Sequence, residues 1–152
     1  MTADLVARLR ELRQTVATAE SLTAGLVAAE LASVPGASSV LRGGLIVYAT
    51  ELKAKLAGVD EALLAEHGAV HPDVAAQLAA GARERCAATW GLGLTGVAGP
   101  DPQDGVEPGT VYVAVAGPTG SQVRRLSLAG SRNEVRSGSV TAALELLRHH
   151  LG

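Results

Sequence analysis

The chain has 152 residues and a formal net charge of −2, with 13 basic and 15 acidic residues, a single cysteine and no phenylalanine. This length fits one domain over residues 1–152, and the lone Cys86 cannot form an internal disulfide, which fits a reducing compartment. Dispersed basic residues and scarce aromatic rings argue against nucleic acid as a partner. With no basic leader and no run of 18 apolar residues, we expect a soluble, cytoplasmic protein without a membrane partner.

Hydrophobic periodicity divides the chain into alternating helices and strands. Helices are predicted over 4–13, 23–33, 50–57, 60–66, from Pro72 to about Thr89, and over 132–150; strands are predicted over 15–19, 40–48, 90–95, 110–116 and 122–128. Strands separated by helices, with one hairpin late in the sequence, predict the α/β class. The expected architecture is a three-layer α/β/α sandwich with a mixed, mostly parallel sheet of about five strands.

The turn after the first strand carries a hydroxyl, Ser21, at the start of the next predicted helix. Free backbone N–H groups and the positive end of a helix dipole favour a phosphate or a developing oxyanion at such a place. Ser21 therefore suits a nucleophile, and the alternative is that Ser21 or Thr23 is only the N-cap of the helix. Glu20 either orients this turn or caps a backbone group.

A second loop, from Thr95 to Gly109, follows the strand 90–95. Ligands of α/β sheets collect where strands end and helices begin, so this loop and the Ser21 turn are expected to face one crevice. The stretch 96–100 lacks the lysine of a P-loop and does not match the dinucleotide fingerprint. Its bare amides suit a substrate or an oxyanion, and a tight strand exit is the alternative.

A third segment has Tyr48 at a strand end and Lys53 on the first turn of a helix. A desolvated lysine has a lowered pKa and can accept a hydroxyl proton, so Ser21, Tyr48 and Lys53 together would form a nucleophile with its base. Spacing does not show that they meet, and a solvated lysine is the alternative.

Metal binding is not expected from the histidine spacing. His67 and His71 are four residues apart, but Gly68 and Pro72 interrupt the helix that would bring them to one face. No acidic residue completes a ligand set there, so we predict no metal site.

Seven short motifs follow one another along the chain, from about residue 5 to the end: Ala-Glu-Ser-x-Thr at 19–23, Pro-Gly-Ala-Ser at 35–38, Gly43-Gly44 with Tyr48 and Lys53, Gly68-Ala69-Val70, Thr95 to Pro100, Gly109 to Tyr112, and Arg132 with Val135-Arg136. In wording and order they resemble the CinA C-terminal domain family, the nicotinamide-nucleotide amidohydrolases or NMN deamidases. Each motif is weak alone, but the ordered set is specific.

The resemblance implies hydrolysis of the carboxamide of nicotinamide mononucleotide (NMN) to the acid and ammonia, in pyridine nucleotide recycling, without metal or cofactor. It implies Ser21 as nucleophile, Lys53 as its base, Tyr48 as a partner in proton transfer, and Thr95 with its loop in the substrate and oxyanion site. The partner is then a small pyridine nucleotide. Further substrate-binding residues implied by the motifs are Thr23, Gly43, Gly44, Gly96, Ala98, Gly99, Arg132 and Arg136, with the two arginines as candidates for the phosphate.

Four positions depart from the family pattern. Leu22 replaces a usual cysteine, Thr50 a usual asparagine, and Ala24 a glycine whose replacement is expected to tighten the turn and crowd the pocket. Glu107 stands in a loop that lacks the common Lys-Pro. The sequence also shows no counterpart of the additional N-terminal domain of longer CinA proteins.

Other functions stay open on the sequence alone. Ala24 and the missing Lys-Pro suit a module of the same fold that binds a nucleotide without hydrolysis, or an amidase for a related substrate. A scaffold for protein interactions is a third class, since fold does not fix function. Apolar, alanine-rich helices predict a homodimer or a higher homo-oligomer.

Overall fold

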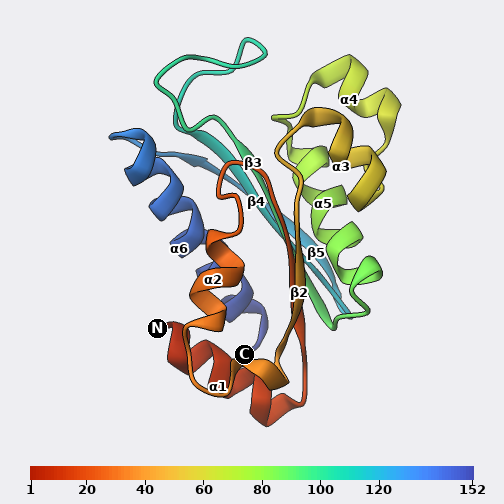
Figure 1. Cartoon of the computed structure of the whole chain (residues 1–152), viewed down its shortest axis with the longest axis vertical. Helices are drawn as coiled ribbons and strands as arrows, with labels where there is room; N and C mark the ends of the chain where they lie inside the picture. The colour runs from red at the N-terminus through yellow and green to blue at the C-terminus, as the bar shows by residue number, and fades with distance from the viewer.

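Five strands form one sheet that helices cover on both faces in a computed structural model describing residues 1–152 (Figure 1). The elements in chain order are α1 (Thr2–Leu12), β1 (Val16–Glu20), α2 (Leu26–Ala32), the 3-10 turn η1 (Ala37–Ser39), β2 (Leu41–Ile46), α3 (Thr50–Ala57), α4 (Glu61–His67), α5 (Pro72–Arg85), β3 (Trp90–Gly96), β4 (Thr110–Gly117), β5 (Gly120–Ser127) and α6 (Arg132–His150).

The sheet has the strand order β2-β1-β3-β4-β5. β1 pairs in parallel with β2 and β3, whereas β4 pairs antiparallel with both β3 and β5. The three-layer architecture with a mixed five-stranded sheet is confirmed, but only two of the four strand pairings are parallel. The reason is that β3, β4 and β5 are joined without a crossover helix, so the chain must return antiparallel.

The two faces of the sheet carry different helices. α1, α2 and α6 cover one face, and α3, α4 and α5 cover the other (Figure 1). With so few aromatic rings, leucine, valine and alanine fill both cores. α5 lies almost in backbone contact with β3, because a Cβ added at Gly93 would stand 2.4 Å from the Ala75 carbonyl oxygen. Small residues therefore let helix and strand backbones approach closely, and the core is filled without bulky aromatic rings.

α2 starts later than the sequence predicts. The helix expected from residue 23 begins at Leu26, because Ala24 and Gly25 have φ values of 48° and 100°. This left-handed backbone cannot continue a helix, so residues 21–25 form a turn of their own. α5 likewise ends at Arg85, before a left-handed Ala87, rather than near Thr89.

None of the helices combines the length and the hydropathy that a bilayer-spanning helix requires.

Candidate active site

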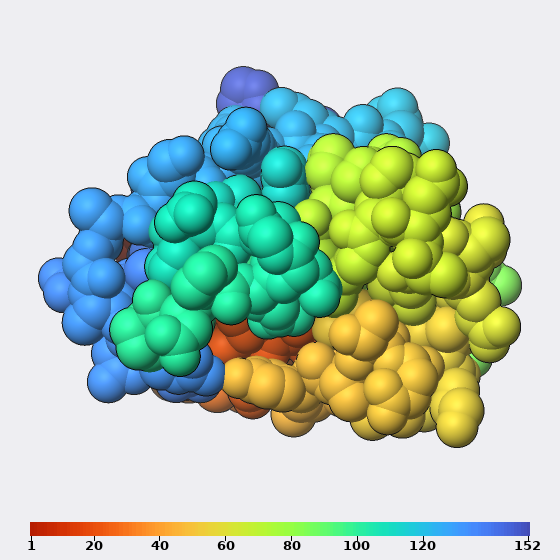
Figure 2. Space-filling model, turned by 90° about the horizontal axis from the view of Figure 1, so that it is seen from above, coloured from red at the N-terminus to blue at the C-terminus, as the bar shows by residue number.

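A cleft of about 370 Å³ opens at the end of the sheet where β1 and β3 finish. Figure 2 views this end, with the loop after β3 in teal and the segment near residue 20 visible in the hollow beside it. Of the residues that the motifs imply, Ser21, Tyr48, Gly96, Ala98, Gly99 and Arg132 line the cleft. The remaining ones do not line it: Thr23, Gly43, Gly44, Lys53, Thr95 and Arg136.

The Ser21 turn is held by backbone contacts on two sides. The Ser21 N–H donates to the Leu94 carbonyl of β3 at 3.1 Å, and Arg136 Nε donates to the Leu22 carbonyl at 2.9 Å. Ser21 itself is 9% exposed at the cleft. Arg136 therefore supports the wall of the cleft from behind.

Neither hydroxyl of the turn caps α2. The N-cap is Gly25, and the Glu20 carboxylate accepts hydrogen bonds from the N–H groups of Val27 and Ala28 at 2.9 and 3.0 Å. The N-cap alternative for Ser21 and Thr23 is thus wrong, and the capping alternative for Glu20 is confirmed. The first amides of α2 are therefore not available to an anion in the cleft.

Other amides at the cleft are unpaired. The backbone N–H groups of Leu22, Ala98 and Gly99 have no acceptor within the chain, and all three residues line the cleft. A developing negative charge near Ser21 would thus meet donors from the turn and from the loop after β3.

Lys53 is buried behind the strand end. Its side chain is 1% exposed, and Nζ donates to the carbonyl oxygens of Val47 at 2.8 Å and Tyr48 at 3.2 Å. Burial lowers the pKa of Lys53 to about 8, against a smaller raising effect of the Glu51 and Asp104 carboxylates. The alternative of a solvated surface lysine is therefore wrong.

A short backbone path links Lys53 with the Ser21 turn. The Val47 N–H donates to the Glu20 carbonyl at 2.9 Å, and Glu20 directly precedes Ser21. No hydrogen bond joins Ser21 Oγ to Lys53 Nζ, whose two acceptors are carbonyl groups. A neutral amine that donates both of its N–H groups to carbonyl oxygens still has a lone pair that can accept a proton.

Tyr48 and Arg132 join opposite walls of the cleft. Arg132 donates through Nη2 to the Tyr48 hydroxyl at 2.8 Å and through Nη1 to the Gly99 carbonyl at 2.7 Å. Both side chains are exposed, and Tyr48 is 55% accessible. Their polar atoms are therefore within reach of a ligand that enters the cleft.

The loop after β3 is fastened to the segment before α5. The buried Thr95 hydroxyl donates to the Ala69 carbonyl at 2.7 Å, and the Ala69 N–H donates to the Asp104 carboxylate at 3.4 Å. Thr95 thus holds the base of the loop.

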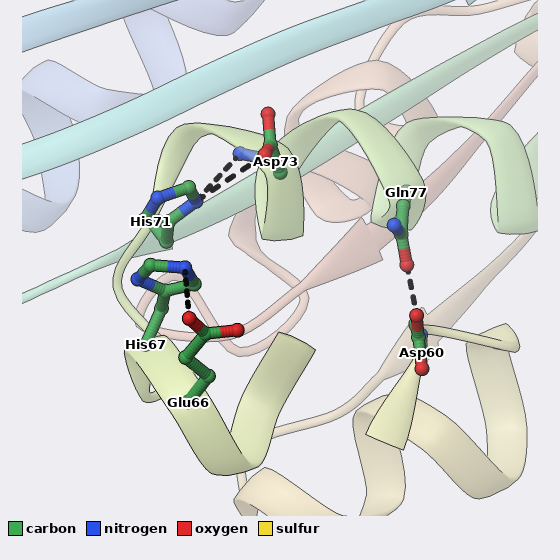
Figure 3. Close-up of polar contacts among 6 residues, drawn as sticks. All are labelled: Asp60, Glu66, His67, His71, Asp73 and Gln77. Atoms are coloured by element: carbon green, nitrogen blue, oxygen red, sulfur yellow. Dashed lines mark hydrogen bonds and ion pairs between the residues drawn. The ribbon is translucent and has the colours of Figure 1, made fainter. Parts of the chain in front are cut away.

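The histidines of this segment stack on each other. Figure 3 shows His67 and His71 face to face, with 4.4 Å between ring centroids, and the Glu66 and Asp73 carboxylates beside them. The His67 Nε2–Glu66 and His71 Nδ1–Asp73 nitrogen–oxygen distances are 3.8 and 3.9 Å. His71 Nδ1 accepts the Asp73 N–H at 3.1 Å and so caps α5. No three His, Cys, Asp or Glu side chains gather as a metal site.

Gly43 and Gly44 lie in the middle of β2, away from the cleft. A Cβ at Gly44 would stand 2.6 Å from Thr18 Oγ1, which itself donates to the Glu20 carboxylate at 2.9 Å. Thr23 donates to the same carboxylate at 2.8 Å. Gly44, Thr18 and Thr23 therefore pack around the Glu20 carboxylate beneath the turn and do not form the cleft surface.

Comparisons with known proteins agree with this architecture. The family model of the CinA C-terminal domain matches residues 1–151. The chain belongs to the CinA C-terminal domain family. A CinA-like protein of Frankia casuarinae is 51% identical over 137 residues, which are 90% of this chain and 32% of that protein. A CinA-like protein of Anaeromyxobacter dehalogenans is 48% identical over 145 residues, covering 95% of this chain and 36% of that protein.

Solved structures of CinA proteins share the whole fold. The competence/damage inducible protein CihA of Agrobacterium tumefaciens superposes with a TM-score of 0.91 at 32% identity, over 97% of this chain and 94% of that one. A CinA superfamily protein of Escherichia coli gives a TM-score of 0.94 at 30% identity, over 98% and 87% of the two chains. The chain spans about a third of the length of the curated CinA-like relatives named above.

The departures from the CinA motifs lie mostly outside the cleft. Ala24 is exposed and does not line it, so the expected crowding of the pocket is wrong. Its left-handed φ costs roughly 1 kcal/mol relative to glycine. Leu22 is 4% exposed and packs into the core, while Glu107 is exposed on the loop.

Sequence reasoning missed part of the CinA cleft. Asp101, Pro102 and Gln103 line it together with Leu22. The signal that could have found them is their position directly after the glycine-rich motif, since that loop was already expected to face the crevice. Asp101 places a carboxylate in the same cleft as the Arg132 guanidinium.

Proposed function

We propose that the domain hydrolyses the carboxamide of NMN to nicotinate mononucleotide and ammonia, with Ser21 as nucleophile and Lys53 as its base. The observation that carries the proposal is a buried lysine, with a pKa of about 8, that is bonded to the Val47 carbonyl. Val47 is itself bonded to Glu20, the residue directly before the cleft-lining Ser21. Perturbed amines near a nucleophilic hydroxyl are typical of catalytic sites.

The lowered pKa makes the base available. At pH 7 about one Lys53 in ten is neutral, whereas an ordinary lysine is neutral in well under one in a thousand molecules. Neutral Lys53 takes the proton of Ser21 Oγ, and Oγ attacks the carboxamide carbon. The unpaired amides of Leu22, Ala98 and Gly99 supply donors for the oxyanion.

Collapse of the tetrahedral intermediate breaks the carbon–nitrogen bond. Ammonia leaves with the proton held on Lys53, and the Tyr48 hydroxyl, bonded to Arg132, relays protons at the cleft mouth. Water then attacks the acyl-serine ester and gives its proton to Lys53. The ester bond breaks, Lys53 returns this proton to Ser21 Oγ, and the acid leaves. Arg132 retains further N–H donors that can bind the substrate phosphate. The Asp101 carboxylate in the same cleft repels the second negative charge of a fully ionised phosphate.

The test is ammonia release from NMN by the parent, Ser21→Ala and Lys53→Met. Lys55→Met is the matched control, because Lys55 lies on the same helix but is exposed and outside the cleft. We expect release by the parent and Lys55→Met and its loss in the other two, with folding checked by circular dichroism. A folded Ser21→Ala protein as active as the parent would rule out the mechanism.

A second function is supported by the contacts of Lys53. Because Nζ is bonded to two carbonyls and not to Ser21, the site also suits a module that binds the nucleotide without cleaving it. Calorimetric binding of NMN by a parent protein that releases no ammonia would favour this function.

A further inference from the structure

Glu20 is a buried carboxylate without a cation beside it. It is the last residue of β1, directly before Ser21, and its side chain is fully buried. Four donors surround it at 2.8 to 3.0 Å: the hydroxyls of Thr18 and Thr23 and the N–H groups of Val27 and Ala28. Both carboxylate oxygens thus have two partners each, which offsets the cost of burying the charge.

Three of the four donors belong to the turn and to the start of α2. Thr23 lies inside the turn 21–25, and Val27 and Ala28 lie in the first turn of the helix that follows it. The carboxylate therefore ties both ends of the segment that carries Ser21 to the end of β1. The fourth donor, Thr18, approaches from the strand.

The backbone of Glu20 reaches the other half of the site. Its carbonyl accepts the Val47 N–H at 2.9 Å, and the Val47 carbonyl accepts Lys53 Nζ at 2.8 Å. One residue is thus fixed through its side chain to the Ser21 turn and through its main chain to the group that holds the lysine.

We propose that Glu20 is a positioning residue for the reaction, which sets the Ser21 turn relative to Lys53 through its carboxylate. This inference rests on the proposed function, but it concerns how Ser21 is held and not which substrate is cleaved. Glu20 itself does not line the cleft. It acts through Thr23 and the first amides of α2, whose shift would move Ser21 Oγ and the Leu22 amide together.

Two buried threonines separate positioning from plain stability. Thr18 and Thr23 are both 0% exposed, and each donates one hydrogen bond to the same carboxylate, at 2.9 and 2.8 Å. Valine has the same shape as threonine and removes only the hydroxyl. Thr23→Val loosens the turn, whereas Thr18→Val loosens the strand side.

The experiment measures three quantities on the parent, Thr18→Val, Thr23→Val and Glu20→Gln. They are kcat and KM for ammonia release from NMN, the rate at which phenylmethylsulfonyl fluoride sulfonylates Ser21 as read by mass spectrometry, and the midpoint of urea unfolding. Ser21→Ala identifies the labelled residue.

We expect Thr23→Val to lower kcat and the labelling rate by about tenfold with little change in KM, because a displacement of about 1 Å costs up to a hundredfold in rate. Thr18→Val should lose a similar amount of stability but keep kcat and the labelling rate within about twofold. Glu20→Gln should resemble Thr23→Val with a larger loss, since an amide NH₂ faces donors.

Equal kinetic losses in Thr18→Val and Thr23→Val would overturn the positioning role, even if Glu20→Gln fails to fold. A parent that releases no ammonia but is labelled at Ser21 would contradict the proposed function alone, and the labelling rates would still decide on Glu20. A parent that is neither active nor labelled would overturn both.

Discussion

Replacing Lys53 by methionine should change how the stability of the domain depends on pH. Methionine is an unbranched side chain one heavy atom shorter than lysine, and it cannot carry a charge. The pKa of Lys53 is lowered from 10.5 to about 8 in the folded protein, chiefly by burial. The unfolded chain exposes Lys53, so its pKa there is near 10.5.

The direction follows from proton binding. Between pH 8 and 10.5 the folded parent has lost the Lys53 proton while the unfolded parent still holds it, so the free energy of unfolding rises with pH. This contribution is complete above 10.5 and is lost as pH falls through 8. From pH 7 to pH 9.5 the parent should gain about 2 kcal/mol relative to Lys53→Met.

The assay is urea unfolding of both proteins at pH 7, 8, 9 and 9.5. Taking the difference between parent and variant removes the titration of all other groups. Lys55→Met is the matched control, because Lys55 lies on the same helix but is exposed. A parent–variant difference that stays constant over this range would refute the buried, pKa-lowered lysine and with it the proposed base.

Three further outcomes follow from the same geometry. The kcat/KM for ammonia release should rise about tenfold per pH unit below pH 8 and level off above it, and a flat profile would exclude Lys53 as the base. Tyr48→Phe should lower ammonia release by about tenfold and leave stability within about 0.5 kcal/mol, because the exposed hydroxyl bonds only Arg132. Gly44→Ala should lower the free energy of unfolding by about 1–3 kcal/mol, because the new Cβ clashes with Thr18. Gly43→Ala should lower it far less, because its Cβ would lie at an ordinary contact distance of 3.6 Å from Cys86 Sγ. Thermal denaturation of both variants measures the difference.

Strand-end logic located the cleft correctly from the sequence. Ser21, Tyr48 and the loop from Gly96 follow β1, β2 and β3, and the carboxyl ends of parallel strands meet at one edge of a sheet. Arg132 could be placed there only through the family motif, because nothing local in the sequence joins the start of α6 to Tyr48. The expected homo-oligomer stays a prediction.

Long-range contacts account for what the sequence did not reveal. Hydroxyls before a helix indicate a cap, yet the first amides of α2 are bonded to the Glu20 carboxylate. Glu20 lies five residues before the N-cap Gly25, and its carboxylate reaches these amides only because the turn folds back. Such a cap has no signature in local propensity. The same fold-back consumed the helix amides that had been expected to face the substrate.

Lys53 shows most clearly why local pattern is insufficient. On α3 it lies between an exposed Glu51 and an exposed Lys55, so its sequence context is that of a solvated helix face. Its buried amine instead donates to the carbonyls of Val47 and Tyr48, which directly follow β2, the strand that pairs with β1. Those carbonyls accept hydrogen bonds that water would otherwise accept, which allows an amine to be buried without an acidic partner. An adjacent carboxylate would instead have raised the pKa and kept the amine charged. The chemistry of the candidate base therefore depends on backbone groups, and these are determined by the arrangement of strands rather than by any residue type in the motif.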